Sequence, residues 1–236
     1  MDSPIIVALD LVQEEALALA NKLKPEECRL KIGSQLFTQS NDDLLLNLQD
    51  MGFDIFLDLK FHDIPNTVKE AVLASQEMGV WMTNVHALGG REMLKAARLE
   101  LNPKKQSSTS LVSTPLLIGV TILTSLDRNS LDEIGFKRGL EDQVLHLAKI
   151  CKQEGLDGVV CSPREITKLR HVLGKEFLLV VPGIRSESVV SNDQKRTDTP
   201  VSAIKDGADY IVIGREITLD KNPDNKVKEI LDSISK

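Results

Sequence analysis

The segment DLKFHD, residues 58–63, holds two carboxylates and an ammonium group within six positions. Asp58 and Lys60 are two residues apart, a spacing that points both side chains to one face of a strand. Opposite charges inside an apolar fold are costly unless they pair or take part in chemistry. The spacing therefore predicts either an internal salt bridge or an ammonium group held beside a reacting substrate.

Charged residues also accompany the two preceding apolar runs. Asp10 ends the first run, and Lys31 lies in the second. With Asp58 and Lys60 they occupy corresponding positions in three successive runs, in alternating order of acid and base. At about 4 Å and an effective dielectric of about 20, each such pair interacts by roughly 4 kcal/mol. This alternation suits an ammonium group that must lie close to developing negative charge.

Asp63 and Thr67 also have a simpler interpretation. Asp63 lies two residues before Pro65, as the N-cap of a following helix would. Thr67 and Glu70 have the spacing of a capping box. From the residues alone, capping and a functional role are both open for Asp63 and Thr67.

Eight short apolar runs must position these residues, and helical spacing recurs between them. They are predicted as strands at Ile5–Asp10, Cys28–Gly33, Asp54–Lys60, Met82–Ala87, Leu116–Leu123, Gly158–Ser162, Phe177–Ile184 and Tyr210–Ile217. Strands alternating with helices indicate a parallel sheet. Eight units of about 30 residues most simply close into an α/β fold of the (β/α)8 TIM-barrel type. A doubly wound open sheet is the competitor, but its glycine-rich turn is missing after the first run.

Two arginines lie at the ends of the seventh and eighth runs, and barrels often bind phosphate with the loops after these two strands. Arg185 follows one run, and Arg215 comes directly after Gly214 in the other. Gly214 would let backbone amides approach an anion, and Arg215 could hold it with two hydrogen bonds. Gln194 lies in the long polar loop 186–199, which could close over the anion. The simpler interpretation of Arg215 is a surface arginine at a helix start.

Other polar features give weaker signals. The Ser/Thr-rich segment 102–114 is predicted as a surface loop away from the site. Alternation points His62 away from Asp58 and Lys60, and His86 is expected to pack behind the site.

Composition excludes several classes of protein. The 236 residues, 42% of them hydrophobic, predict a single domain spanning 1–236. A net charge of −6 and 3% aromatic residues argue against nucleic-acid binding. No apolar run is long enough to span a bilayer and no leader is evident, which favours the cytoplasm. Cys28, Cys151 and Cys161 form no CxxC pair, so buried thiols are expected rather than disulfides or a metal site.

The segment DLKFHDIPNTV resembles the signature of the orotidine 5′-phosphate decarboxylase family. Further matches run through most of the chain, in ALD, LKIG, VHALGG, GVTILTS, VVPGIR and ADYIVIGREI. The resemblance implies a homodimeric (β/α)8 barrel. It also implies decarboxylation of orotidine 5′-monophosphate to UMP with no metal or other cofactor.

The resemblance also implies roles for individual residues. Lys31, Asp58, Lys60 and Asp63 would form the catalytic network, with Asp63, Ile64 and Thr67 contributed to the site of the partner subunit. Asp10 would contact the ribose and Thr124 would lie over the pyrimidine, while Arg185, Gln194, Gly214 and Arg215 would hold the phosphate.

The expected mechanism depends on Lys60. Loss of CO₂ leaves an electron pair on C6 outside the conjugated ring system, so an ammonium group must stabilise it and then protonate C6. Asp58 would either strain the substrate or orient Lys60. One alternative is a Mg²⁺-dependent sugar-phosphate decarboxylase or aldol-type synthase of the same superfamily, which needs an acid at the position of Lys31. Another is a catalytically silent barrel that senses a phosphate ligand.

Overall fold

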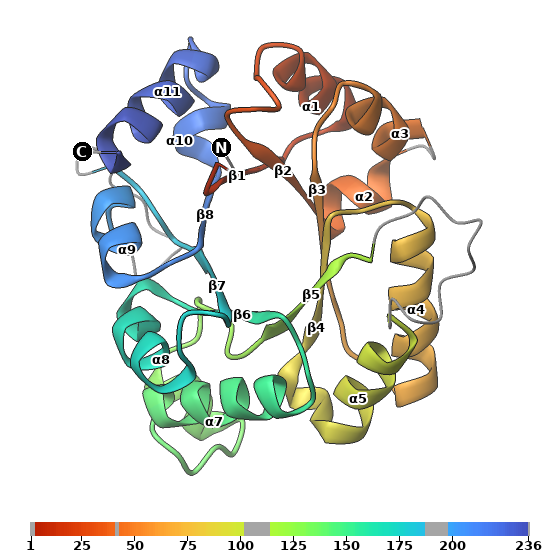
Figure 1. Cartoon of the computed structure of the whole chain (residues 1–236), viewed down its shortest axis with the longest axis vertical. Helices are drawn as coiled ribbons and strands as arrows, with labels where there is room; N and C mark the ends of the chain where they lie inside the picture. Colours follow the sequence, from red (N-terminus) through yellow and green to blue (C-terminus); the bar gives the residue numbers. More distant parts are fainter. Residues whose placement is uncertain (1–2, 41–42, 102–113, 187–197, 236) are drawn as a thin grey trace.

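The computed structural model describes residues 3–40, 43–101, 114–186 and 198–235. Within these segments, eight parallel strands close into a barrel in the order β1 to β8, and helices surround it (Figure 1). The predicted (β/α)8 barrel is confirmed. Most of the predicted loops 102–114 and 186–199, including Gln194, lies outside the described residues.

Strands and helices alternate along the chain as the pattern predicted. The strands are β1 (Ile5–Ala8), β2 (Arg29–Gly33), β3 (Ile55–Phe61), β4 (Met82–His86), β5 (Leu116–Val120), β6 (Gly158–Val160), β7 (Leu178–Pro182) and β8 (Tyr210–Ile213). The helices are α1 (Gln13–Ala20), α2 (Ser34–Gln39), α3 (Asp43–Asp50), α4 (Pro65–Glu77), α5 (Gly90–Glu100), α6 (Arg128–Glu133), α7 (Leu140–Gln153), α8 (Ile166–Leu173), α9 (Pro200–Asp206), α10 (Arg215–Thr218) and α11 (Pro223–Ile234), with short 3₁₀ turns η1 (Ala87–Gly89) and η3 (Pro163–Glu165).

The strands are buried on both faces. One set of side chains fills the barrel interior, including Phe56, Met82 and Val180. The alternate set, such as Val7 and Leu57, packs outward in the larger core shared with the helices. Burial on both faces explains why these strands appear in the sequence as continuous apolar runs.

Several strands end earlier than the apolar runs. The strand that was predicted to reach Ile217 ends at Ile213, and helix α10 begins at Arg215. The strand predicted to Leu123 likewise ends at Val120. Ile217 is fully buried, but on α10, which contacts β1. An apolar run indicates which residues are buried but does not determine their backbone conformation. The prediction of a strand across 214–217 was therefore wrong.

All three cysteines are buried and none forms a disulfide, as predicted. Burial raises the pKa of the Cys28 and Cys151 thiols to about 12, so both stay protonated in the folded protein. No helix in the described segments is long and apolar enough to cross a membrane.

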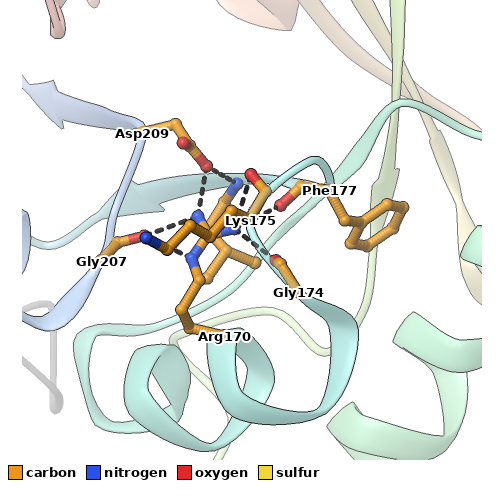
Figure 2. A network of polar contacts seen from close by, with 7 residues as sticks. Arg170, Gly174, Lys175, Phe177, Gly207 and Asp209 are labelled. Atoms are coloured by element: carbon orange, nitrogen blue, oxygen red, sulfur yellow. Dashed lines mark hydrogen bonds and ion pairs between the residues drawn. The ribbon is translucent and has the colours of Figure 1, made fainter.

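Arg170 of α8 ties together the amino-terminal ends of β7 and β8 (Figure 2). Its guanidinium donates to the carbonyl oxygens of Gly174 and Gly207 at 2.7 and 2.6 Å. It also donates to the Asp209 carboxylate at 2.5 Å, and the same carboxylate oxygen accepts the Leu179 N–H at 2.7 Å. One side chain therefore satisfies polar groups of three elements at the end of the barrel where the strands begin.

Replacing Arg170 with alanine should lower the free energy of unfolding by about 2–4 kcal/mol, because several carbonyls lose their donor and Asp209 loses its charge partner. The midpoint of urea unfolding measures this loss. Lys168→Ala on the same helix is the matched control, since its ion pair with Asp142 is exposed and should contribute little. An Arg170→Ala protein as stable as Lys168→Ala would show that the network does not support the barrel.

Candidate active site

A cavity of about 920 Å³ opens at the carboxyl ends of the strands. Its apolar floor includes Phe56, Val180 and Val212 of the barrel interior. Eight residues singled out from the sequence line it: Asp10, Lys31, Asp58, Lys60, Thr124, Arg185, Gly214 and Arg215. They come from β2 and β3 and from the segments after β1, β5, β7 and β8, so barrel closure brings them to one place.

Four charged side chains form a continuous chain along one wall of this cavity. Lys31 Nζ lies 3.4 Å from Asp10 Oδ1 and 3.3 Å from Asp58 Oδ2, and Lys60 Nζ lies 2.8 Å from Asp58 Oδ1. The Asp58 side chain is 10% exposed and that of Lys60 is 38% exposed. Each buried charge has an opposite neighbour, which offsets the cost of burial. The alternating order predicted from the sequence is confirmed, and it leaves the Lys60 ammonium accessible at one end.

Lys60 reaches Asp58 through an irregular backbone. Its φ is +54°, the only positive φ of a non-glycine residue in the described segments. β3 carries three residues, 58–60, opposite the single residue Asn84 of β4. A left-handed conformation costs a non-glycine residue roughly 1–2 kcal/mol, and such strain persists only where the surrounding structure enforces it. The spacing of Asp58 and Lys60 correctly predicted that they meet, but the regular strand assumed for that meeting is interrupted.

Asn84 of β4 lies fully buried beside the charged residues, and sequence reasoning missed it. Its Oδ1 accepts the Lys60 N–H at 2.8 Å, and its Nδ2 donates to Asp58 Oδ1 at 2.7 Å. The sequence held one signal that could have identified Asn84, an amide side chain within a strand that is buried on both faces. Such a group needs hydrogen-bond partners, and a neighbouring strand is where they must lie.

Arg185 and Arg215 line a different part of the rim, after β7 and β8. Gly183 has φ +81°, a conformation that glycine adopts readily, and it shapes the turn before Arg185. Helix α10 is joined to the segment after β7, because the Glu216 carboxylate accepts hydrogen bonds from the Ser186 hydroxyl and from the Ser186 N–H, the latter at 2.9 Å. Two guanidinium groups on joined segments can hold an anion such as phosphate.

Asp63, Ile64 and Thr67 do not line the cavity of their own chain. All three are exposed, Ile64 by 67%. Helix α4 begins at Pro65 with Ile64 as its N-cap, so the capping interpretations of Asp63 and Thr67 were wrong. The Asp63 carboxylate accepts the adjacent Ile64 N–H at 2.6 Å, and Thr67 lies inside the first turn. Their exposure leaves the three side chains accessible to another molecule.

His86 at the end of β4 is uncharged at neutral pH. Burial, followed by the neighbouring charges of His62 and Lys60, lowers the pKa of His86 to about 4. Its Nδ1 is buried with no hydrogen-bond partner among the described residues. The His62 ring lies 5.2 Å from the His86 ring. His86 therefore adds no positive charge to the wall that holds Lys31 and Lys60.

The described residues contain no group of three or more His, Cys, Asp or Glu side chains that could hold a metal ion. Asp10 and Asp58, the carboxylates that line the cavity beside β1 and β3, both pair with Lys31. An ammonium group between two carboxylates repels a divalent cation. This donor set suits an organic anion better than a metal.

Comparisons with known proteins agree over nearly the whole chain. The family described as "Orotidine 5'-phosphate decarboxylase / HUMPS family" matches residues 3–230. A protein named orotidine 5′-phosphate decarboxylase from Vibrio campbellii (strain ATCC BAA-1116) is 48% identical over 236 residues, 100% of this chain and 99% of the relative. Its namesake from Aliivibrio fischeri (strain MJ11) is 50% identical over 230 residues, 97% and 96% of the two chains. The crystal structure of orotidine 5′-phosphate decarboxylase from Lactobacillus acidophilus superposes with a TM-score of 0.87 at 39% identity, covering 100% of both chains.

Proposed function

The chain belongs to the orotidine 5′-phosphate decarboxylase / HUMPS family, and we propose that it is a carboxy-lyase that converts orotidine 5′-monophosphate to UMP and CO₂. The observation that carries the proposal is the Lys60 ammonium, 2.8 Å from Asp58 and accessible from the cavity. The similarity to named decarboxylases at 48–50% identity supports this branch of the family.

The cavity suits a nucleoside monophosphate. Its volume of about 920 Å³ is within the range of small-molecule sites. Arg185, Arg215 and Gly214, together with Gln194, would hold the phosphate. Asp10 would contact the ribose, and Thr124 would lie over the pyrimidine above the apolar floor.

The reaction breaks the bond between C6 and its carboxylate, and the bonding electron pair stays on C6 in the ring plane. Ring conjugation cannot spread this charge, so a fixed positive group must stabilise it. The Lys60 ammonium supplies that charge and then donates a proton to C6 as CO₂ leaves. Lys60 recovers a proton from water. Asp58 would lie beside the departing carboxylate while it holds Lys60.

The metal-dependent sugar-phosphate branch of the superfamily requires a different residue at the position of Lys31 on the second strand. An acidic ligand is needed there, and this chain has Lys31, which is paired with both Asp10 and Asp58. The proposed chemistry needs neither a metal nor an organic cofactor, because the charge of Lys60 performs the stabilisation.

We also propose a cytoplasmic homodimer with active sites shared across the interface. Asp63, Ile64 and Thr67 are exposed at the start of α4 and lie away from their own cavity. In a dimer, these side chains would complete the site of the partner subunit.

The proposed function is tested by assaying CO₂ release from orotidine 5′-monophosphate after extensive EDTA treatment. Full activity in the chelator is expected, and added Mg²⁺ should not increase it. Activity that disappears with EDTA and returns with Mg²⁺ would favour the metal-dependent branch. No release of CO₂ under either condition would refute decarboxylation of this substrate.

A further inference from the structure

Asn84 makes two hydrogen bonds that join the backbone of Lys60 to the carboxylate of Asp58. We propose that Asn84 is a positioning residue that aims the Lys60 ammonium at the reacting carbon. The proposal rests on the proposed function, because it assigns Asn84 to the same site.

The backbone of Lys60 depends on Asn84 for a hydrogen-bond partner. In a regular parallel ladder, main-chain groups of neighbouring strands satisfy one another. At residues 58–60 the register between β3 and β4 shifts, and Asn84 alone lies opposite them. Its Oδ1 takes the Lys60 N–H at 2.8 Å, in the place of a main-chain carbonyl. This bond holds Lys60 at φ +54°, and irregularities of this kind redirect side chains beside active sites.

The carboxylate of Asp58 is also held by Asn84. Asp58 Oδ1 accepts from Asn84 Nδ2 at 2.7 Å and pairs with Lys60 Nζ at 2.8 Å, while Oδ2 pairs with Lys31 Nζ at 3.3 Å. Both oxygens are thereby fixed in direction. The amide is neutral, so it orients Asp58 without competing with Lys60 for its charge.

Loss of either bond would let the Lys60 ammonium drift from its position beside C6, in the plane of the ring. A misplacement of about 1 Å can cost about 100-fold in rate. Asn84 does not line the cavity, so substrate binding should depend on it little. The expected signature is a loss of kcat with KM nearly unchanged.

The first experiment compares Asn84→Ala with Thr83→Val in the full-length protein. Thr83 is the adjacent residue of β4 and equally buried, and its hydroxyl donates to the Leu57 main-chain carbonyl at 3.3 Å rather than to a charged side chain. We expect kcat for orotidine 5′-monophosphate to fall about 100-fold in Asn84→Ala and less than about threefold in Thr83→Val. An equal fall in both variants, or a loss confined to KM, overturns the proposal.

The second experiment uses Asn84→Asp, which keeps the shape of the side chain and an oxygen for the Lys60 N–H. The introduced carboxyl faces Asp58 of β3. The other titratable groups nearby are Lys60 of β3, Lys31 of β2 and His86 farther along β4. Two carboxyls at hydrogen-bond distance share one proton. The protonated form can donate to Asp58 as the amide does, whereas the ionised form repels it.

The kcat of Asn84→Asp relative to wild type should therefore rise at least about tenfold as the pH falls from about 8 to about 5.5. A merely structural defect would not recover at low pH. A ratio that stays constant across this range overturns the proposal.

A crystal structure of Asn84→Ala separates this proposal from the proposed function, because it needs no activity. We expect Lys60 to leave the left-handed region and its Nζ to move out of hydrogen-bond distance of Asp58. A Lys60 that keeps both its φ and its contact with Asp58 refutes the positioning role, whatever substrate the enzyme takes.

Discussion

Replacing Lys60 with alanine is expected to lower kcat for orotidine 5′-monophosphate by more than about 10⁴-fold, because one group supplies both electrostatic stabilisation and the proton. Binding of UMP, followed by calorimetry, should remain close to that of wild type. Arg185 and Arg215 remain in place on the other part of the rim and would still hold the phosphate.

The Lys60→Ala protein should fold, which makes the result interpretable. Removing one partner of a buried ion pair normally destabilises a protein. Here Asp58 retains Lys31 at 3.3 Å and Asn84 at 2.7 Å. Lys168→Ala, far along the chain on the exposed face of α8, is the control for loss of a lysine. Turnover in Lys60→Ala within about tenfold of that control would contradict a catalytic role for Lys60.

Lys60→Ala and Asp63→Ala are each expected to be nearly inactive alone, and mixing the two variants is expected to restore activity. If the sites are shared across a two-fold dimer, each mixed dimer has one site with an intact Lys60 and an intact Asp63. Random exchange in an equal mixture should then restore about a quarter of the wild-type sites. The measurement is CO₂ release before and after subunits are exchanged under mild denaturation.

The result can be interpreted only if subunits have exchanged between the two variants. One variant therefore carries an affinity tag, which allows mixed dimers to be isolated. Wild-type protein taken through the same exchange is the positive control. Purified mixed dimers that remain inactive would contradict a shared site. Activity of Asp63→Ala alone near the wild-type level would show that Asp63 is not needed at all.

The position of the site could be predicted because it follows from local patterns. Apolar runs that recur with helical spacing between them determine a parallel barrel, and the carboxyl ends of its strands must converge. Asp10, Lys31 and Asp58 lie at those ends, so their meeting at one cavity followed from the sequence order. Arg215, at the end of the eighth run, was placed at the cavity by the same argument.

The details that depend on how one strand meets another could not be predicted. Ile217 is buried like a strand residue, yet it belongs to α10, because burial on β1 does not require extended backbone. The capping spacing of Thr67 was wrong because the turn before α4 places Pro65, rather than Thr67, at the helix start.

The chemistry of the site shows the same division. The sequence by itself determined the barrel, the alternating acids and bases, and the identity of the lysine that can reach a ligand. Only the tertiary structure decided how Lys60 is aimed, because the left-handed backbone at that residue depends on a shifted register between β3 and β4. The partner that satisfies this backbone, Asn84, lies 24 positions along the chain. The local spacing of residues cannot indicate such a contact, because the contact exists only after the two strands are paired.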